Sequence, residues 1–171
     1  KDKIDIFLVE ADYALKYSDT DYTMAVSDLG ITDDELANQY DYTKKILEES
    51  NGVLKGVSWQ STPGVLIYNR EIAKDMWGSD DPADVQKHVS DWDTFYATAS
   101  ELAAKGYKLT ATVNDSYRVY SNNVSSKWVE DGKLNIDPQF KAWADAEKAS
   151  YEAGQTTTGD LWSDEWSAGF Y

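Results

Sequence analysis

The organisation of this chain is decided by one stretch, Gly56-Val57-Ser58-Trp59-Gln60-Ser61-Thr62-Pro63-Gly64-Val65-Leu66-Ile67-Tyr68-Asn69-Arg70. It contains two short apolar runs, each typical of a β-strand, on either side of a polar crossing that carries an indole. Pro63 fixes the backbone φ angle in the crossing, and Gly64 permits close approach of another backbone. The pattern predicts two strands that pass between packed layers, with Trp59 placed where a ligand could reach it.

The sequence before the crossing predicts an α/β unit. Residues 4–9 form a nearly continuous apolar run of strand length, which is typical of a strand covered on both faces. Thr32 and Glu35 have the spacing of a capping box, so we expect a helix over 33–49. Residues 53–57 then read as a second strand. Strand, helix and strand in this order predict a βαβ-like unit.

The sequence after the crossing is mostly helical, with a further strand predicted over 109–113 and a turn at Asp131-Gly132. Capping residues, two of them followed by proline, mark the starts of four predicted helices: Asn69, Asp81-Pro82, Asp115 and Asp137-Pro138. Two further helices are predicted to open at Ser90-Asp91-Trp92-Asp93 and at Ser163-Asp164-Glu165. The change in pattern predicts two domains. Residues 1–62 form the α/β part with its connecting strand, and residues 63–171 form the helix-rich part.

Composition excludes several classes of function. The 171 residues carry a formal net charge of −15, which repels the phosphate backbone, so we expect no nucleic-acid partner. The absence of cysteine removes disulfides, thiolate chemistry and cysteine-type zinc sites. No apolar run approaches the ~20 residues that span a bilayer. The abrupt start and the end soon after a predicted helix start are those expected of an internal fragment.

The polar residues offer few candidates for catalysis. Glu10 and Asp12 follow the first predicted strand, and they could be a general acid/base pair, hydrogen-bonding groups for a polar ligand, or ordinary loop acids. His88 is the only histidine and is expected at the surface near a helix end, so neither a catalytic triad nor a zinc site can be assembled. Nucleotide-binding glycine motifs and an EF-hand loop are absent, so we expect no cofactor and no metal.

The aromatic residues fall into two groups. Those at helical spacing are expected in the core: Trp92, Phe95, Phe140 and Trp143. Those in polar, glycine-bearing segments are candidates for ligand contact: Trp59, Trp162 and Trp166. An indole face beside hydroxyl and amide groups suits a sugar, because the C–H faces of a pyranose pack on aromatic rings and its hydroxyl rim needs polar partners.

Three segments in order resemble the extracellular solute-binding proteins of carbohydrate ABC transporters (family 1 type). They are Ile4-Asp5-Ile6-Phe7 with Glu10-Ala11-Asp12-Tyr13, then Trp59 to Ala73 with its Tyr68-Asn69-Arg70 ending, and then Asp91-Trp92-Asp93-Thr94-Phe95. The resemblance implies an α/β, periplasmic-binding-protein-like (type II) fold in partial form. Residues 1–62 would be a piece of the first lobe with a hinge strand, and 63–171 much of a helix-rich second lobe.

The resemblance also implies a function. The parent protein would be an extracytoplasmic lipoprotein, lipid-anchored at the outer face of a bacterial cell membrane. As a monomer it would bind a sugar or oligosaccharide by lobe closure and deliver it to the ABC transporter permease without chemistry. The ligand-binding residues would be Glu10, Asp12 and Tyr13 on the first lobe, Trp59, Gln60 and Ser61 at the hinge, and Asp115, Tyr117, Arg118, Trp162 and Trp166 on the second lobe.

Two other functions remain open from the sequence. Glu10 or Asp12 could serve as the acid of a carbohydrate-active hydrolase. The chain could also be a non-catalytic adhesion domain of a surface protein. A sugar titration separates both from a transport protein, because only a hydrolase turns the sugar over and a bare adhesion domain shows no response.

Overall fold

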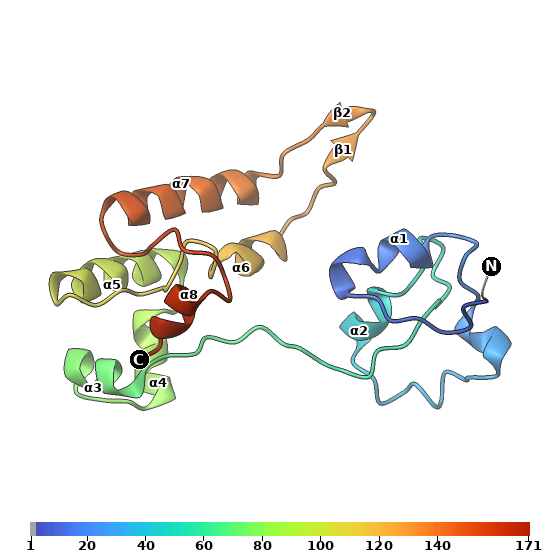
Figure 1. Cartoon of the computed structure of the whole chain (residues 1–171), viewed down its shortest axis with the longest axis horizontal. Helices are drawn as coiled ribbons and strands as arrows, with labels where there is room; N and C mark the ends of the chain where they lie inside the picture. Colours follow the sequence, from blue (N-terminus) through green and yellow to red (C-terminus); the bar gives the residue numbers. More distant parts are fainter. Residues whose placement is uncertain (1–2) are drawn as a thin grey trace. The chain divides into compact units, whose positions relative to one another are not determined.

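The computed structural model describes residues 3–171. The chain divides into two compact units, Lys1–Pro63 and Gly64–Tyr171, and each is described by itself (Figure 1). The sequence placed the boundary between residues 62 and 63. Whether the two units are the lobes of a binding protein stays a prediction.

The first unit is built from short helical turns. In chain order these are the 3-10 helix η1 (Ala11–Tyr13), α1 (Leu15–Ser18), the 3-10 helix η2 (Val26–Leu29) and α2 (Asp41–Lys45). An isolated antiparallel bridge pairs Glu48 with Leu54. The buried side chains are small: Ala14, Ser18, Val26 and Thr43. A core of this size buries little apolar surface, so the unit has few contacts that hold it together.

The predicted capping box forms, but the long helix after it does not. The backbone N–H of Thr32 donates to Glu35 Oε2 at 2.9 Å, and the N–H of Glu35 donates to Thr32 Oγ1 at 3.4 Å. The box holds the pKa of Glu35 below its usual value through the Thr32 hydrogen bonds. Turns follow, and only α2 is helical within 33–49. Among 33–38 only Leu36 is partly buried, so a helix there would have no apolar face to pack.

The strands predicted over 4–9, 53–57 and 109–113, and in the apolar run 65–68 after the crossing, are wrong as secondary structure. Among residues 3–171 the only strands are β1 (Val129–Glu130) and β2 (Lys133–Leu134), which pair antiparallel. A strand needs the backbone of a neighbour for its hydrogen bonds, and residues 4–8 lie exposed instead. Leu54 forms only the isolated bridge to Glu48, and 109–113 consists mainly of bends and a turn. The α/β, periplasmic-binding-protein-like fold class stays a prediction.

The second unit is helical. Its helices are α3 (Arg70–Trp77), α4 (Pro82–Val85), the 3-10 helix η3 (Gln86–His88), α5 (Trp92–Ala104), α6 (Tyr117–Ser121), α7 (Pro138–Glu152) and α8 (Asp164–Ala168). Capping side chains accept from backbone N–H groups at the predicted helix starts: Asn69 at α3, Asp81 at α4, Asp137 at α7 and, within the two predicted opening runs, Asp91 at α5 and Ser163 at α8. These predictions are confirmed, because a cap depends only on local geometry.

The Tyr68-Asn69-Arg70 segment is fastened to the second unit at the start of α3. The Tyr68 hydroxyl donates to the backbone carbonyl of Asp80 at 3.0 Å, and Arg70 Nε donates to Asp80 Oδ2 at 2.9 Å. Asn69 caps the helix between them by accepting from Ile72 N at 3.2 Å. The Arg70 hydrogen bond holds the pKa of Asp80 below its usual value. The segment therefore sets where α3 begins.

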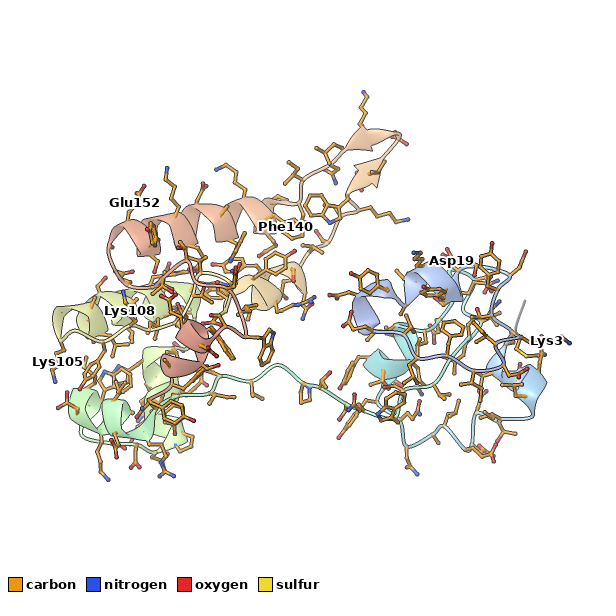
Figure 2. All side chains as sticks on the ribbon, in the orientation of Figure 1. Lys3, Asp19, Lys105, Lys108, Phe140 and Glu152 are labelled. Carbon is orange, nitrogen blue, oxygen red and sulfur yellow. The ribbon has the colours of Figure 1, made fainter. Side chains whose placement is uncertain are left out.

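The buried apolar residues of the second unit include Ala73 of α3, Val85 of α4 and Tyr120 of α6. The Trp92 ring stacks on Tyr120 with centroids 4.3 Å apart and an interplanar angle of 17°. Ala99 and Leu102 of α5 are buried. Aromatic pairs extend this packing along α7, where Trp128 stacks on Phe140 at 4.5 Å (Figure 2 labels Phe140). The aromatic residues predicted in the core are only partly buried: Trp92, Phe95, Phe140 and Trp143. Trp92 and Trp143 join the helices through ring contacts with Tyr120 and Tyr117.

His88 is less exposed than the surface position that the sequence predicts. Its ring stacks on Trp77 at 4.2 Å and 9°, and the side chain is half-buried. Its backbone carbonyl accepts from Thr98 Oγ1 at 2.7 Å. The helix end folds back on α3, so the imidazole is placed against an indole that local sequence does not reveal. No helix among residues 3–171 is long and apolar enough to cross a membrane.

The hairpin of β1 and β2 projects from the ends of α6 and α7 (Figure 1). Its turn has left-handed backbone at Asp131 (φ 50°) and Gly132 (φ 72°), which confirms the predicted turn. At its base Asp137 accepts from Ser125 N at 2.9 Å, Ser126 N at 3.0 Å and Ser126 Oγ at 2.8 Å. Its other oxygen caps α7 through Gln139 N at 2.9 Å. One carboxylate therefore joins the hairpin to the helix.

Asp137 is expected to make the second unit sensitive to acid. Hydrogen bonds to Gln139 and Ser125 lower the pKa of Asp137 from 3.8 to about 2. A carboxylate whose pKa is lower in the folded state than in the unfolded state stabilises the native state at pH values above the unfolded-state pKa. This stabilisation is lost as the pH falls through the folded-state pKa. The midpoint temperature of unfolding, measured by circular dichroism, should therefore decrease as the pH is lowered from about 4 to about 2.

Asp137→Asn is the matched variant for this titration. Asparagine retains a carbonyl oxygen for the cap on Gln139, but its amide nitrogen faces donors from Ser125 and Ser126. The thermal midpoint of the variant should be lower than that of the native chain at pH 6, and the gap should narrow toward pH 2. A gap that stays constant with pH would contradict the role given to the carboxylate.

Candidate functional site

The predicted site residues of the first unit lie on η1. Glu10 caps it, because Glu10 Oε2 accepts from the backbone N–H of Asp12 at 3.0 Å. Asp12 and Tyr13 are within the turn, and both side chains are exposed. The sequence placed all three after a strand, and the structure places them on an exposed helical turn instead. Acid/base chemistry and sugar binding by Glu10 and Asp12 both stay predictions.

The predicted hinge residues are also exposed. Trp59 is 72% exposed, and Gln60 and Ser61, which follow it, are exposed as well. The Ser58 hydroxyl donates to the backbone carbonyl of Gln60 at 2.8 Å and accepts from its N–H at 3.2 Å. Gln39 Nε2 donates to the Ser58 carbonyl at 3.1 Å, which ties this segment to the first unit. The indole of Trp59 is therefore presented to solvent from a fixed backbone.

In the second unit, Asp115 is joined to a tryptophan far along the chain. Asp115 Oδ1 accepts from Trp166 Nε1 at 2.9 Å, and Asp115 Oδ2 accepts from the backbone N–H of Thr112 at 3.0 Å. The sequence assigned Asp115 as the cap of the following helix, and this is wrong. Ser116 is the cap residue of α6, because the Asp115 carboxylate turns back to Thr112. The carboxylate thus orients an indole instead of a helix.

Trp166 is the centre of an aromatic cluster on α8. Its ring lies 4.8 Å from that of Trp162 and 4.8 Å from that of Phe170. Trp162 is 82% exposed and has a φ of 69°, in the left-handed region that bulky residues rarely occupy. Such a backbone costs about 1–3 kcal/mol and recurs at functional sites. The structure therefore presents one strained, exposed indole beside a second one that is held in place.

The remaining predicted residues of the second unit lie on α6. The Tyr117 ring meets the edge of Trp143 at 5.1 Å and lies 6.2 Å from Phe140, so it packs on α7. Arg118 is exposed on the same helix. The structure thus brings together Asp115, Trp162 and Trp166, while the Tyr117 ring serves packing.

Sequence reasoning missed a buried polar cluster behind Asp115. Glu147 is 4% exposed, and its Oε1 accepts from Tyr96 OH at 2.9 Å and from Ser116 Oγ at 2.5 Å. Because Ser116 directly follows Asp115, this cluster fixes the backbone on which Asp115 stands. One signal was present in the sequence: Glu147 lies four residues after Trp143, on the helix face predicted to be buried.

Burial raises the pKa values of Tyr96 and of Tyr120, to which Tyr96 is hydrogen-bonded. Burial, with the hydrogen bonds to Tyr120 and Glu147, raises the pKa of Tyr96 well above its usual value. Burial also raises the pKa of Tyr120. The Tyr96 phenol therefore keeps its proton throughout the physiological range and stays a donor to Glu147. Among the described residues, no group of three or more histidine, cysteine or acidic side chains could hold a metal ion.

Phe170 was also missed, although its spacing of four residues from Trp166 is that of neighbours on a helix face. The cluster of Asp115, Trp162, Trp166 and Phe170 is called the α8 platform below.

Comparisons with models of protein families, with curated proteins and with solved structures found no match.

Proposed function

We propose that the chain binds a sugar through the α8 platform, as part of an extracytoplasmic solute-binding protein that delivers ligand to an ABC transporter permease without chemistry. The family resemblance motivates the transport role. The observation that carries the sugar is Trp162, an indole exposed to 82% of its surface in spite of a strained backbone. An unstrained, buried position would serve packing better, so exposure at this cost favours contact with a ligand.

Asp115 is the polar partner that a sugar requires, and it lies against Trp166, whose ring is 4.8 Å from that of Trp162. Each oxygen of Asp115 accepts one protein hydrogen bond, from Trp166 Nε1 at 2.9 Å or from Thr112 N at 3.0 Å. A carboxylate oxygen has a second acceptor site, so Asp115 can also accept from a sugar hydroxyl. The indole face packs on the C–H face of the ring, and the carboxylate orients the hydroxyl rim. Lobe closure, which the resemblance implies, stays a prediction.

A titration of the full chain with mono- and oligosaccharides tests the proposal. With the seven tryptophans labelled with nitrogen-15, the indole resonances of Trp162 and Trp166 should shift, and those of the half-buried Trp77 and Trp92 should stay. Trp162→Ala should weaken binding about tenfold or more, because the stacked ring contact is lost.

Trp128→Ala is the matched control, because Trp128 is 52% exposed and lies outside the α8 platform. It should bind the sugar with unchanged affinity. A native chain that shows no shift of any indole resonance across the panel would exclude the sugar. Equal losses in the two variants would exclude the platform as its site.

A further inference from the structure

A polar groove of about 550 Å³ lies beside the α8 platform. Its lining includes Lys108, Tyr151, Thr156, Thr158, Gly159 and Glu165 (Lys108 is labelled in Figure 2). The volume lies within the range of ~300–1,000 Å³ that is usual for ligand pockets. None of these residues was a candidate in the sequence.

The floor of the groove is fixed by internal hydrogen bonds. Lys108 Nζ donates to the carbonyl of Gly154 at 3.0 Å, so two lining residues are joined. Thr110 Oγ1 donates to Thr156 Oγ1 at 2.8 Å, and Thr157 Oγ1 donates to the carbonyl of Ala111. Bonds of this kind hold the 156–159 backbone against the segment 110–113. The floor is therefore preorganised, and a ligand need not order it.

The rim, in contrast, carries polar groups that are available to a ligand. Within residues 3–171 the hydroxyl groups of Thr158 and Tyr151 and the carboxylate of Glu165 have no hydrogen-bond partner, and all three side chains are exposed. The Tyr151 ring is 51% exposed, so it offers an aromatic face at the end of the groove where α7 stops. Hydroxyl, carboxylate and aromatic groups together are those that suit a pyranose ring.

The groove adjoins the α8 platform through α8 itself. Glu165, which lines the groove, directly precedes Trp166, and Trp166 contacts Trp162 at 4.8 Å. Glu165 also faces the groove floor, because a Cβ on Gly159 would lie 3.6 Å from Glu165 Oε2. Consecutive residues of one helix therefore belong to the groove and to the platform, Glu165 to the first and Trp166 to the second.

We propose that the groove extends the sugar site of the α8 platform, so that the ligand is an oligosaccharide of at least two rings. One ring packs on Trp162, and a later ring reaches Tyr151 across the rim of Thr158 and Glu165. This inference rests on the proposed function, since it assigns the length of the sugar bound at the same site.

Calorimetry on the full chain tests the length dependence, with glucose, maltose and maltotriose as one series and glucose, cellobiose and cellotriose as the other. In the linkage series that binds, the Kd should fall about tenfold or more from one ring to three, because further rings add contacts to a floor already ordered. Tyr151→Ala should remove most of that gain and leave the glucose Kd unchanged. Tyr22→Ala, an exposed tyrosine of the first unit, is the matched control and should change neither.

The outcomes separate the two proposals. A sugar that binds with the same Kd at every length, or a Tyr151→Ala variant with the native length dependence, overturns the groove and leaves the platform intact. A native chain that binds no member of either series overturns the platform and the groove together. Loss of glucose binding in Tyr151→Ala also overturns the groove, because Tyr151 would then belong to the first ring's site.

Discussion

Trp92→Ala is expected to lower the free energy of unfolding of the second unit by about 3 kcal/mol, at the low end of large-to-small substitutions of tryptophan because the ring is only half-buried. The indole stacks on Tyr120 at 4.3 Å and meets Phe95 edge-on at 5.4 Å. Removing it leaves a cavity at the junction of α5 and α6. Against a total stability of ~5–15 kcal/mol, this loss is large.

Urea denaturation followed by far-ultraviolet circular dichroism measures the effect. Trp128→Ala is again the matched control, because Trp128 contacts one ring, Phe140, and is half exposed. It should cost about 1 kcal/mol, the value of one aromatic pair near the surface. Equal losses at the two positions would show that the Trp92 ring is not the centre of the core.

Glu147→Ala is the second large expected effect, a loss of about 2–4 kcal/mol in the free energy of unfolding. The substitution removes the acceptor shared by Tyr96 OH at 2.9 Å and Ser116 Oγ at 2.5 Å. Each buried hydroxyl left without its partner costs about 1–3 kcal/mol. Tyr96 retains its hydrogen bond with Tyr120, which limits the total.

The isosteric variant separates the lost acceptor from the lost volume. Glu147→Gln retains a carbonyl oxygen in the place of Oε1, so both hydroxyls can still donate to it. In the same urea titration, Glu147→Gln should lower the free energy of unfolding clearly less than Glu147→Ala does. If the alanine and glutamine variants unfold at the same urea concentration, the hydroxyl bonds to Oε1 do not carry the stability of the cluster.

The sequence predicted the features of the fold that depend on neighbouring residues. Asn69, Asp91 and Ser163 each accept from a backbone N–H two or three residues later, so the cap is visible in the sequence itself. The turn at Asp131-Gly132 follows from the tolerance of these two residues for left-handed backbone. The capping box at Thr32 likewise formed, although the helix after it did not.

Features that depend on distant partners could not be predicted. The run at 4–9 has the apolar pattern of a buried strand, but a strand exists only where another backbone accepts its hydrogen bonds. The same holds for the candidate site. Asp115 and Trp166 were both named from the sequence, yet the hydrogen bond between them joins positions 51 residues apart. No spacing rule specifies such a pair. The spacing of Glu147 from Trp143 indicates burial, but its partners Tyr96 and Ser116 lie 51 and 31 residues away.

The projecting hairpin is a suitable position for attaching a fluorescent label to this protein. Its tip at Asp131-Gly132 is exposed, while Trp128 and Asp137 anchor its base through Phe140, Ser125 and Ser126. Exposed loop tips are the positions that best tolerate added groups. Because the chain contains no cysteine, one cysteine introduced as Lys133→Cys, beside the left-handed turn, would be its sole thiol. A fluorophore attached there would report on the protein from a hairpin that lies away from α8 (Figure 1).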